Sequence, residues 1–156
     1  MSATVGQPAP DFSLPGTDGT DEGRRDYSLS QYLGQVVVLV FYPGDNTRVC
    51  TRQLNAYTED IDSFTEAGAQ VLAISPQSVE SHEEFSCAQG GFAFPLLADG
   101  DKAVGQAYGI VGSLGFYRRS AFVVDAEGII RYAHRAVAGL TFRSTEELVE
   151  AVKAAR

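Results

Sequence analysis

Two runs of apolar residues stand out in the hydrophobic pattern of this chain. Residues 36–41 contain only valine, leucine and phenylalanine, and residues 69–75 form a second apolar run that stops before Pro76. Continuously apolar runs that are rich in β-branched residues are typical of strands covered on both faces of a sheet. We therefore predict two buried strands, one at 36–41 and one at 69–75.

Helix periodicity lies between these strands and beyond them. Residues 48–67 predict a single amphipathic helix that ends at Gly68. Its apolar positions recur at spacings of three and four residues: Leu54, Tyr57, Ile61 and Phe64. A second helix is expected from about residue 78 to residue 89, with Cys87 near its end. A capping-box pattern at 144–147 opens a C-terminal helix.

Shorter elements bounded by turn residues complete the pattern. They are an extended lead-in with a short strand over 6–14, a hairpin or loop over 16–25, a capped helical turn over 28–34, a short strand over 93–99, a short helix over 102–108 and an antiparallel hairpin over 121–134. This order predicts an α/β layer fold with a mixed central sheet flanked by helices, in one domain over residues 1–156. In such folds ligands bind at the carboxyl ends of the strands, where residues 43–50 follow the first buried strand.

Composition and charge exclude several classes of function. Of the 156 residues, 44% are apolar and 21% are charged, as in a globular domain. The net charge of −8 argues against binding to nucleic acid or to an anionic membrane, and no apolar stretch is long enough to span a bilayer. The two histidines, His82 and His134, lack the spacing of metal ligands. We expect neither a metal site nor a cofactor.

The two cysteines, Cys50 and Cys87, fit a cytoplasmic protein better than a secreted disulfide scaffold. Cys50 is the more informative, because it falls on the first turn of the helix that follows the 36–41 strand. Unpaired backbone N–H groups and the helix dipole at such a position favour thiolate over thiol. Thr47, three residues earlier, is expected to cap this helix and to aim its hydroxyl at whatever approaches the sulfur.

A resemblance to a known family emerges from these residues. Pro43, Thr47 and Cys50 form a Pro-x-x-x-Thr-x-x-Cys pattern that resembles the active-site signature of the peroxiredoxins, which have a thioredoxin-like fold. Further similarity runs in order along nearly the whole chain, at residues 6–12, 41–54, 94–99 and 119–125, and resembles the bacterioferritin-comigratory, or peroxiredoxin Q, branch. The resemblance implies a thiol-dependent peroxidase that reduces hydrogen peroxide and organic hydroperoxides.

The resemblance also implies roles for individual residues. Cys50 matches the peroxidatic cysteine, whose thiolate attacks the peroxide O–O bond and becomes sulfenic acid. Thr47 matches the residue that hydrogen-bonds the peroxide and the thiolate, and Pro43 matches the proline that shields the pocket from water. Arg119, which follows Arg118, matches the arginine whose charge supports the thiolate and the departing oxygen.

The chain departs from this branch just before and just after Cys50. Arg48 and Val49 stand where many members have Pro-Gly, and Asn55 stands where many carry a resolving cysteine. Other members carry the resolving cysteine on the next helix, which by resemblance points to Cys87. The implied cycle is a disulfide between Cys50 and Cys87 that thioredoxin or another dithiol reduces. A disulfide needs Cα atoms within about 7 Å, so we expect local unwinding when it forms.

Three other interpretations of the cysteines stay open. The protein is alternatively a one-cysteine peroxidase recycled by an external thiol, or a redox-sensing binding module without turnover. A thiol–disulfide oxidoreductase on the same fold is disfavoured by the missing Cys-x-x-Cys motif. A monomer is expected in preference to a dimer, for which apolar faces near Phe92 or Tyr117 would be the candidate surface.

Overall fold

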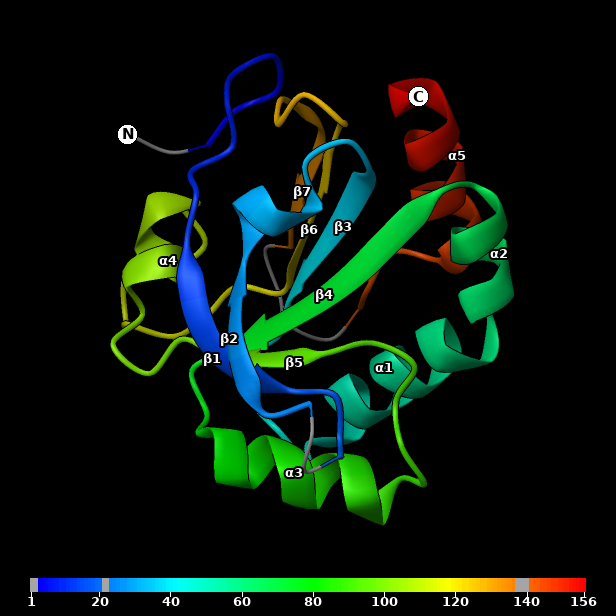
Figure 1. Ribbon diagram of the computed structural model, residues 1–156. Coiled ribbons are helices and arrows are strands. Elements are labelled where there is room, and N and C mark those ends of the chain that lie inside the picture. Colours follow the sequence, from blue (N-terminus) through cyan, green and yellow to red (C-terminus); the bar gives the residue numbers. More distant parts are fainter. Residues whose placement is uncertain (1–2, 21–22, 137–140) are drawn as a thin grey trace.

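The computed structural model describes residues 3–20, 23–136 and 141–156. Within this part of the chain, seven strands form one sheet in the order β2-β1-β5-β4-β3-β6-β7 (Figure 1). The strands are β1 (Ser13–Thr17), β2 (Arg25–Ser28), β3 (Val36–Phe41), β4 (Ala69–Ser75), β5 (Leu96–Ala98), β6 (Ser120–Val124) and β7 (Ile130–Arg135). The helices are η1 (Leu29–Tyr32, a 3₁₀ turn), α1 (Arg48–Glu59), α2 (Ile61–Glu66), α3 (Val79–Ala88), α4 (Ala103–Ala107) and α5 (Thr145–Ala155).

Strand β3 lies inside the sheet, between β4 and β6, and all six of its residues are buried. It pairs in parallel with β4 on one side and antiparallel with β6 on the other. The register with β6 sets Phe41 opposite Ser120, so the end of β3 lies beside the start of β6. Any side chain just before β6 is therefore close to the segment that leaves β3 and enters α1.

Alternate residues of β3 point into two separate apolar clusters, because successive side chains of a strand face opposite sides of the sheet. Val36, Val38 and Val40 belong to a cluster completed by residues of α1, α2, α3 and α5. Val37 and the other odd-numbered residues of β3 belong to a cluster completed by the N-terminal segment and by Tyr108 after α4. Figure 1 shows α4 on the opposite side of the sheet from α1, α2 and α5. The sheet is thus covered on both faces, as predicted.

The predicted strands at 36–41, 69–75 and 93–99, the 121–134 hairpin and the helix that carries Cys87 are confirmed. The first strand begins later than predicted, at Ser13, and pairs with β2, which the pattern did not predict. The prediction of one helix over 48–67 is wrong, because the chain breaks at Asp60 into α1 and α2. Threonine and aspartate have low helix propensity, and they occupy positions 58 and 60. The break lets Phe64 pack edge-on against Tyr57, with ring centroids 5.9 Å apart. Among the described residues, no helix has the length and apolar character needed to cross a membrane.

Candidate active site

Cys50 is the third residue of α1, directly after the loop that leaves β3. Its side chain has no exposed surface. Thr47 caps the helix, and its Oγ1 accepts the backbone N–H of Cys50 at 3.4 Å. The N–H groups of this first turn have no carbonyl one turn earlier to accept them, so they add positive potential near the sulfur. The predicted position of Cys50 at a helix start is confirmed.

Arg119 reaches Cys50 from the start of β6. Its Nη2 lies 3.2 Å from Cys50 Sγ, while its Nη1 donates to Gln53 Oε1, one turn further along α1. Arg119 is only 4% exposed, so water screens its charge weakly. A fixed, weakly screened positive charge against the sulfur stabilises negative charge that develops at this site.

The neighbouring arginine takes a different path. Arg118 donates from its Nε to the carbonyl oxygen of Ala136 at 3.0 Å and from its Nη2 to that of Arg135 at 3.4 Å. Successive residues of an extended chain point to opposite sides, which explains why only one of the two approaches Cys50. Of the adjacent pair, the structure brings Arg119 to the sulfur.

The loop before α1 carries the other two residues singled out in this segment. Thr47 is exposed, and its hydroxyl donates to the carbonyl oxygen of Gly44 at 3.3 Å. Pro43 is half-buried and follows the buried Tyr42 at the end of β3. Arg48, the first of the two departures from the family pattern, is exposed.

Replacing Thr47 by alanine is expected to lower the free energy of unfolding by about 1 kcal/mol, because the N-cap acceptor of α1 is lost. The measurement is urea unfolding followed by circular dichroism. Thr47→Ser keeps the cap oxygen and is the matched control, with stability close to that of the parent. Equal stability of the alanine and serine proteins would contradict the capping role.

Cys87 is the second-to-last residue of α3, and its side chain is exposed. Both cysteines are free thiols. Helix α1 contacts the end of α3 close to Cys87, where Nδ2 of Asn55 in α1 donates to Oε1 of Gln89 at 3.0 Å. The structure therefore groups Cys50, Thr47 and Arg119 at one site, whereas Cys87 lies outside that group on a neighbouring helix.

Sequence reasoning missed two sets of contacts at this site. Gln53 accepts a hydrogen bond from the second terminal nitrogen of the Arg119 guanidinium. Asp45 forms a buried pair with His82, with 2.8 Å between Asp45 Oδ2 and His82 Nδ1. The pattern of the loop contains no signal for either contact. The partners of Asp45 and Gln53 come from segments 37 and 66 residues away along the chain.

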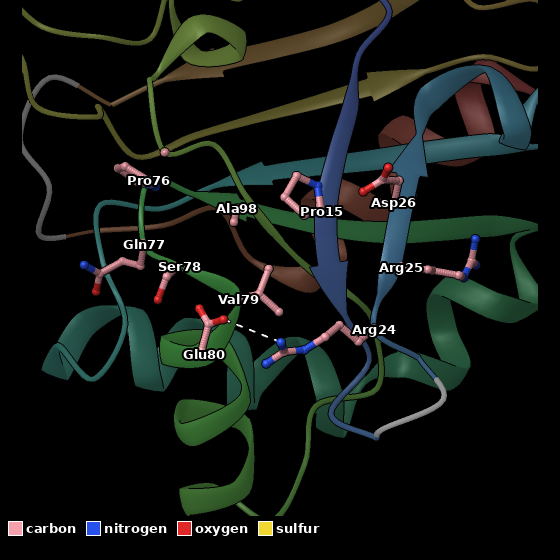
Figure 2. A pocket seen from close by; sticks show the side chains of 11 residues that line it. Pro15, Arg24, Arg25, Asp26, Pro76, Gln77, Ser78, Val79, Glu80 and Ala98 are labelled. Atoms are coloured by element: carbon pink, nitrogen blue, oxygen red, sulfur yellow. Dashed lines mark hydrogen bonds and ion pairs between the residues drawn. The ribbon is translucent and has the colours of Figure 1, made fainter.

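A pocket of about 530 Å³ lies at the start of α3 and is shown in Figure 2. Arg24 crosses it toward Glu80, with a distance of 3.5 Å between Nη1 and Oε1. Among the described residues that line it, none belongs to the predicted site set of Cys50, Thr47, Arg119, Pro43 and Cys87. Gln77 lines this pocket and also accepts the backbone N–H of Asp45 at 2.8 Å, so the pocket borders the loop before α1.

Comparisons with known proteins agree with this geometry. Residues 5–133 match the AhpC/TSA family. The chain is 34% identical to a putative peroxiredoxin in the rubredoxin operon of Clostridium pasteurianum, over 99% of this chain and 90% of that protein. It is 37% identical to a putative peroxiredoxin of Synechocystis, over 97% of this chain and 78% of that protein.

Solved structures give the same fold. AhpC of Enterococcus faecalis is 27% identical with a TM-score of 0.88, covering 99% of this chain and 92% of that one. The bacterioferritin comigratory protein of Xanthomonas campestris, studied for its alkyl peroxide reduction activity, is 29% identical with a TM-score of 0.82. That match covers 97% of this chain and 98% of the Xanthomonas chain. The predicted thioredoxin-like fold with a mixed sheet flanked by helices is confirmed.

Proposed function

Because the chain belongs to the AhpC/TSA family and is a thiol-dependent peroxidase, we propose that Cys50 is its peroxidatic nucleophile. The observation that carries this assignment is the distance of 3.2 Å between Cys50 Sγ and Arg119 Nη2. A buried sulfur beside a fixed positive charge at a helix start is in the environment that generates a reactive thiolate. Cys87, exposed near the end of its helix, lacks these features.

The proposed first step is displacement at the peroxide O–O bond. The Cys50 thiolate attacks the terminal oxygen of ROOH, an S–O bond forms, and the O–O bond breaks. Sulfur becomes a sulfenic acid, and the departing RO⁻ takes a proton from solvent to leave as ROH. Arg119 and the hydroxyl of Thr47 stabilise the negative charge on the departing oxygen. The Thr47 hydroxyl now donates to Gly44, so it must turn toward the peroxide to act.

Access to Cys50 requires motion, because its side chain has no exposed surface. We assign that motion to the loop of Pro43 and Thr47, which precedes the first turn of α1. Pro43 has no backbone N–H to attract water and is half-buried in the loop before α1, which suits its proposed role as a shield. The proposed substrates are hydrogen peroxide and organic hydroperoxides, and small ones are favoured because the sulfur has no exposed surface in the resting fold.

The proposed second step joins the two cysteines. The Cys87 thiolate attacks the sulfenic sulfur of Cys50, an S–S bond forms, the S–O bond breaks, and the oxygen leaves with protons as water. Cys50 is buried and Cys87 is exposed on another helix, so the first turn of α1 and the last turn of α3 unwind. Gly90 and Gly91, both with positive φ, directly follow α3 and ease this change. Thioredoxin or another dithiol then reduces the disulfide.

Replacing Cys87 by serine is expected to stop thioredoxin-linked turnover while sulfenic acid still forms at Cys50. The measurement is the intact mass of the protein after one equivalent of peroxide. The parent should lose two hydrogens as its disulfide forms, and the Cys87→Ser protein should gain one oxygen.

Each alternative has its own outcome in the same experiment. Full thioredoxin-linked turnover by the Cys87→Ser protein would identify a one-cysteine peroxidase recycled by an external thiol. Stoichiometric oxidation of the parent without turnover, with every reductant tried, would identify a redox-sensing module. Peptide mapping that leaves Cys50 and Cys87 unlinked in the oxidised parent would contradict the resolving role of Cys87.

We also propose that the protein acts as a monomer in the cytoplasm. Its two free thiols suit a reducing compartment. Phe92 and Tyr117, the residues that marked a candidate dimer face, are 7% and 5% exposed, which supports the monomer. Leu114 and Phe116 are exposed on the loop before β6 and would be the place of a weaker contact between copies.

A further inference from the structure

A buried polar cluster lies between the site and α3. The side chains of Asp45 and His82 are fully buried, with 2.8 Å between Oδ2 and Nδ1. Tyr42 donates its hydroxyl to Asp45 Oδ1 at 2.8 Å, and Ser81 donates its hydroxyl to Oδ2 at 2.7 Å. Buried polar groups cost free energy unless they are satisfied, and here the donors converge on one carboxylate. The buried polar groups of this cluster therefore satisfy one another inside the protein.

The far nitrogen of the His82 ring fixes the direction of the hydrogen bonds. His82 Nε2 lies 2.9 Å from the carbonyl oxygen of Leu97 in β5. A carbonyl oxygen only accepts, so Nε2 carries a proton and donates. Asp45 accepts from Tyr42 and Ser81, and its Oδ2 lies within hydrogen-bond distance of His82 Nδ1. The cluster is therefore a buried, hydrogen-bonded link between the active-site loop and α3, anchored on the sheet.

On the loop side, Asp45 sets the position from which α1 begins. Its backbone N–H donates to Gln77 Oε1 at 2.8 Å, and its side chain holds Tyr42 at the end of β3. The next residue, Asn46, has φ of 62°, a left-handed conformation that neighbouring contacts must hold in place. Thr47 and the first turn of α1 follow directly in the chain. A displacement of Asp45 would therefore move Cys50 relative to Arg119.

On the helix side, the cluster holds only the first half of α3. Ser81 and His82 bind Asp45, and the preceding Ser78 caps the helix through the N–H of Ser81 at 3.1 Å. Cys87 lies five residues beyond His82, about one and a half turns away, and is exposed near the glycine pair. The half that carries Cys87 thus lies beyond the cluster.

We propose that the Asp45–His82 pair is a positioning device that ties the loop before α1 to the first half of α3 and so holds Cys50 in place against Arg119 for the first step of the reaction. This inference rests on the proposed role of Cys50. Asp45 and His82 are positioning residues, since they act through the loop and α3 and do not touch the sulfur. Burial of the Tyr42 phenol, and next the charge of Asp45, raise its pKa well above the usual value, and the charge of Cys50 adds to this rise. That contribution is consistent with a cluster close to the reacting thiol.

The test is His82→Leu, which removes the hydrogen bonds of both ring nitrogens. Sulfenic acid formation is followed in a Cys87→Ser background, by trapping with dimedone and intact mass. We expect the rate constant to fall by about tenfold to about a hundredfold relative to that background, because small misplacements of reacting groups have effects of this size. His82→Asn keeps a donor toward Asp45 and should restore most of the rate. The same leucine substitution at His134, half-buried on β7, is the matched control and should leave the rate unchanged.

Two milder variants keep the test decisive if His82→Leu does not fold. Tyr42→Phe and Ser81→Ala each remove one hydrogen bond to Asp45, and each should slow sulfenic acid formation by about twofold to about tenfold. Parental rates in both variants, or in a folded His82→Leu protein, would overturn the proposal. Failure of the proposed function has a different signature, since the Cys87→Ser background itself would then form no sulfenic acid at Cys50.

Discussion

The Cys50→Ser protein is expected to consume hydroperoxide at least about a thousandfold more slowly than the parent. A serine hydroxyl at this position has nearly the same size as the thiol, and the cap from Thr47 to the backbone N–H of residue 50 is independent of the side chain. What is lost is the polarisable thiolate that attacks the O–O bond. The measurement is steady-state peroxide consumption with dithiothreitol as reductant, which bypasses any requirement for thioredoxin.

The control for this prediction is the fold of the variant. Urea unfolding of the Cys50→Ser protein should give a midpoint near that of the parent, which ties the loss of activity to chemistry. A folded Cys50→Ser protein that retained more than about a tenth of the parental rate would exclude Cys50 as the nucleophile and move attention to Cys87.

The second large effect is expected at Arg119. Replacement by methionine should lower the rate of sulfenic acid formation by about a hundredfold, as when one preorganised donor is removed from other active sites. The guanidinium lies 3.2 Å from the sulfur and is almost fully buried, so no solvent cation takes its place. Loss of that charge also removes a partner that stabilises the negative charge on the departing oxygen. Stopped-flow rates of sulfenic acid formation, compared at one pH, test this effect.

Arg118→Met is the matched control, because the neighbouring arginine donates to the carbonyl oxygens of Arg135 and Ala136. Its loss is expected to reduce stability while the folded protein keeps the parental rate of sulfenic acid formation. Arg119→Lys retains a charge without the two-armed geometry that also holds Gln53, and an intermediate rate is expected. Equal rates in the parent and in folded Arg119→Met would contradict the role of this arginine.

Local pattern was enough to predict the buried strand at 36–41, the helix start at Cys50 and its threonine cap. These features depend on periodicity and capping, which neighbouring residues encode. The break at Asp60 was missed because the apolar spacing continues through it, and the packing of Phe64 on Tyr57 is a tertiary contact. The catalytic roles of Pro43 and Thr47 stay predictions.

Periodicity and capping do not predict contacts between distant segments, and Arg119 was assigned to Cys50 through the family resemblance alone. The choice of Arg119 over Arg118 follows from the register of β6 against β3, which sets Ser120 opposite Phe41. The burial of His82 depends on where α3 docks against the loop at Asp45, 37 residues earlier. A single sequence carries no information on which of its polar residues meet across such separations.

The unequal exposure of the two thiols also determines which of them is chemically modified first. Bulky electrophiles that modify cysteines reach the exposed Cys87 first, whereas Cys50 has no surface to offer them in the resting fold. If the two cysteines act as proposed, chemical damage removes the resolving thiol before the peroxidatic one. The damaged protein would then keep its first reaction and lose its own recycling, and survive as a slower peroxidase that depends on external thiols.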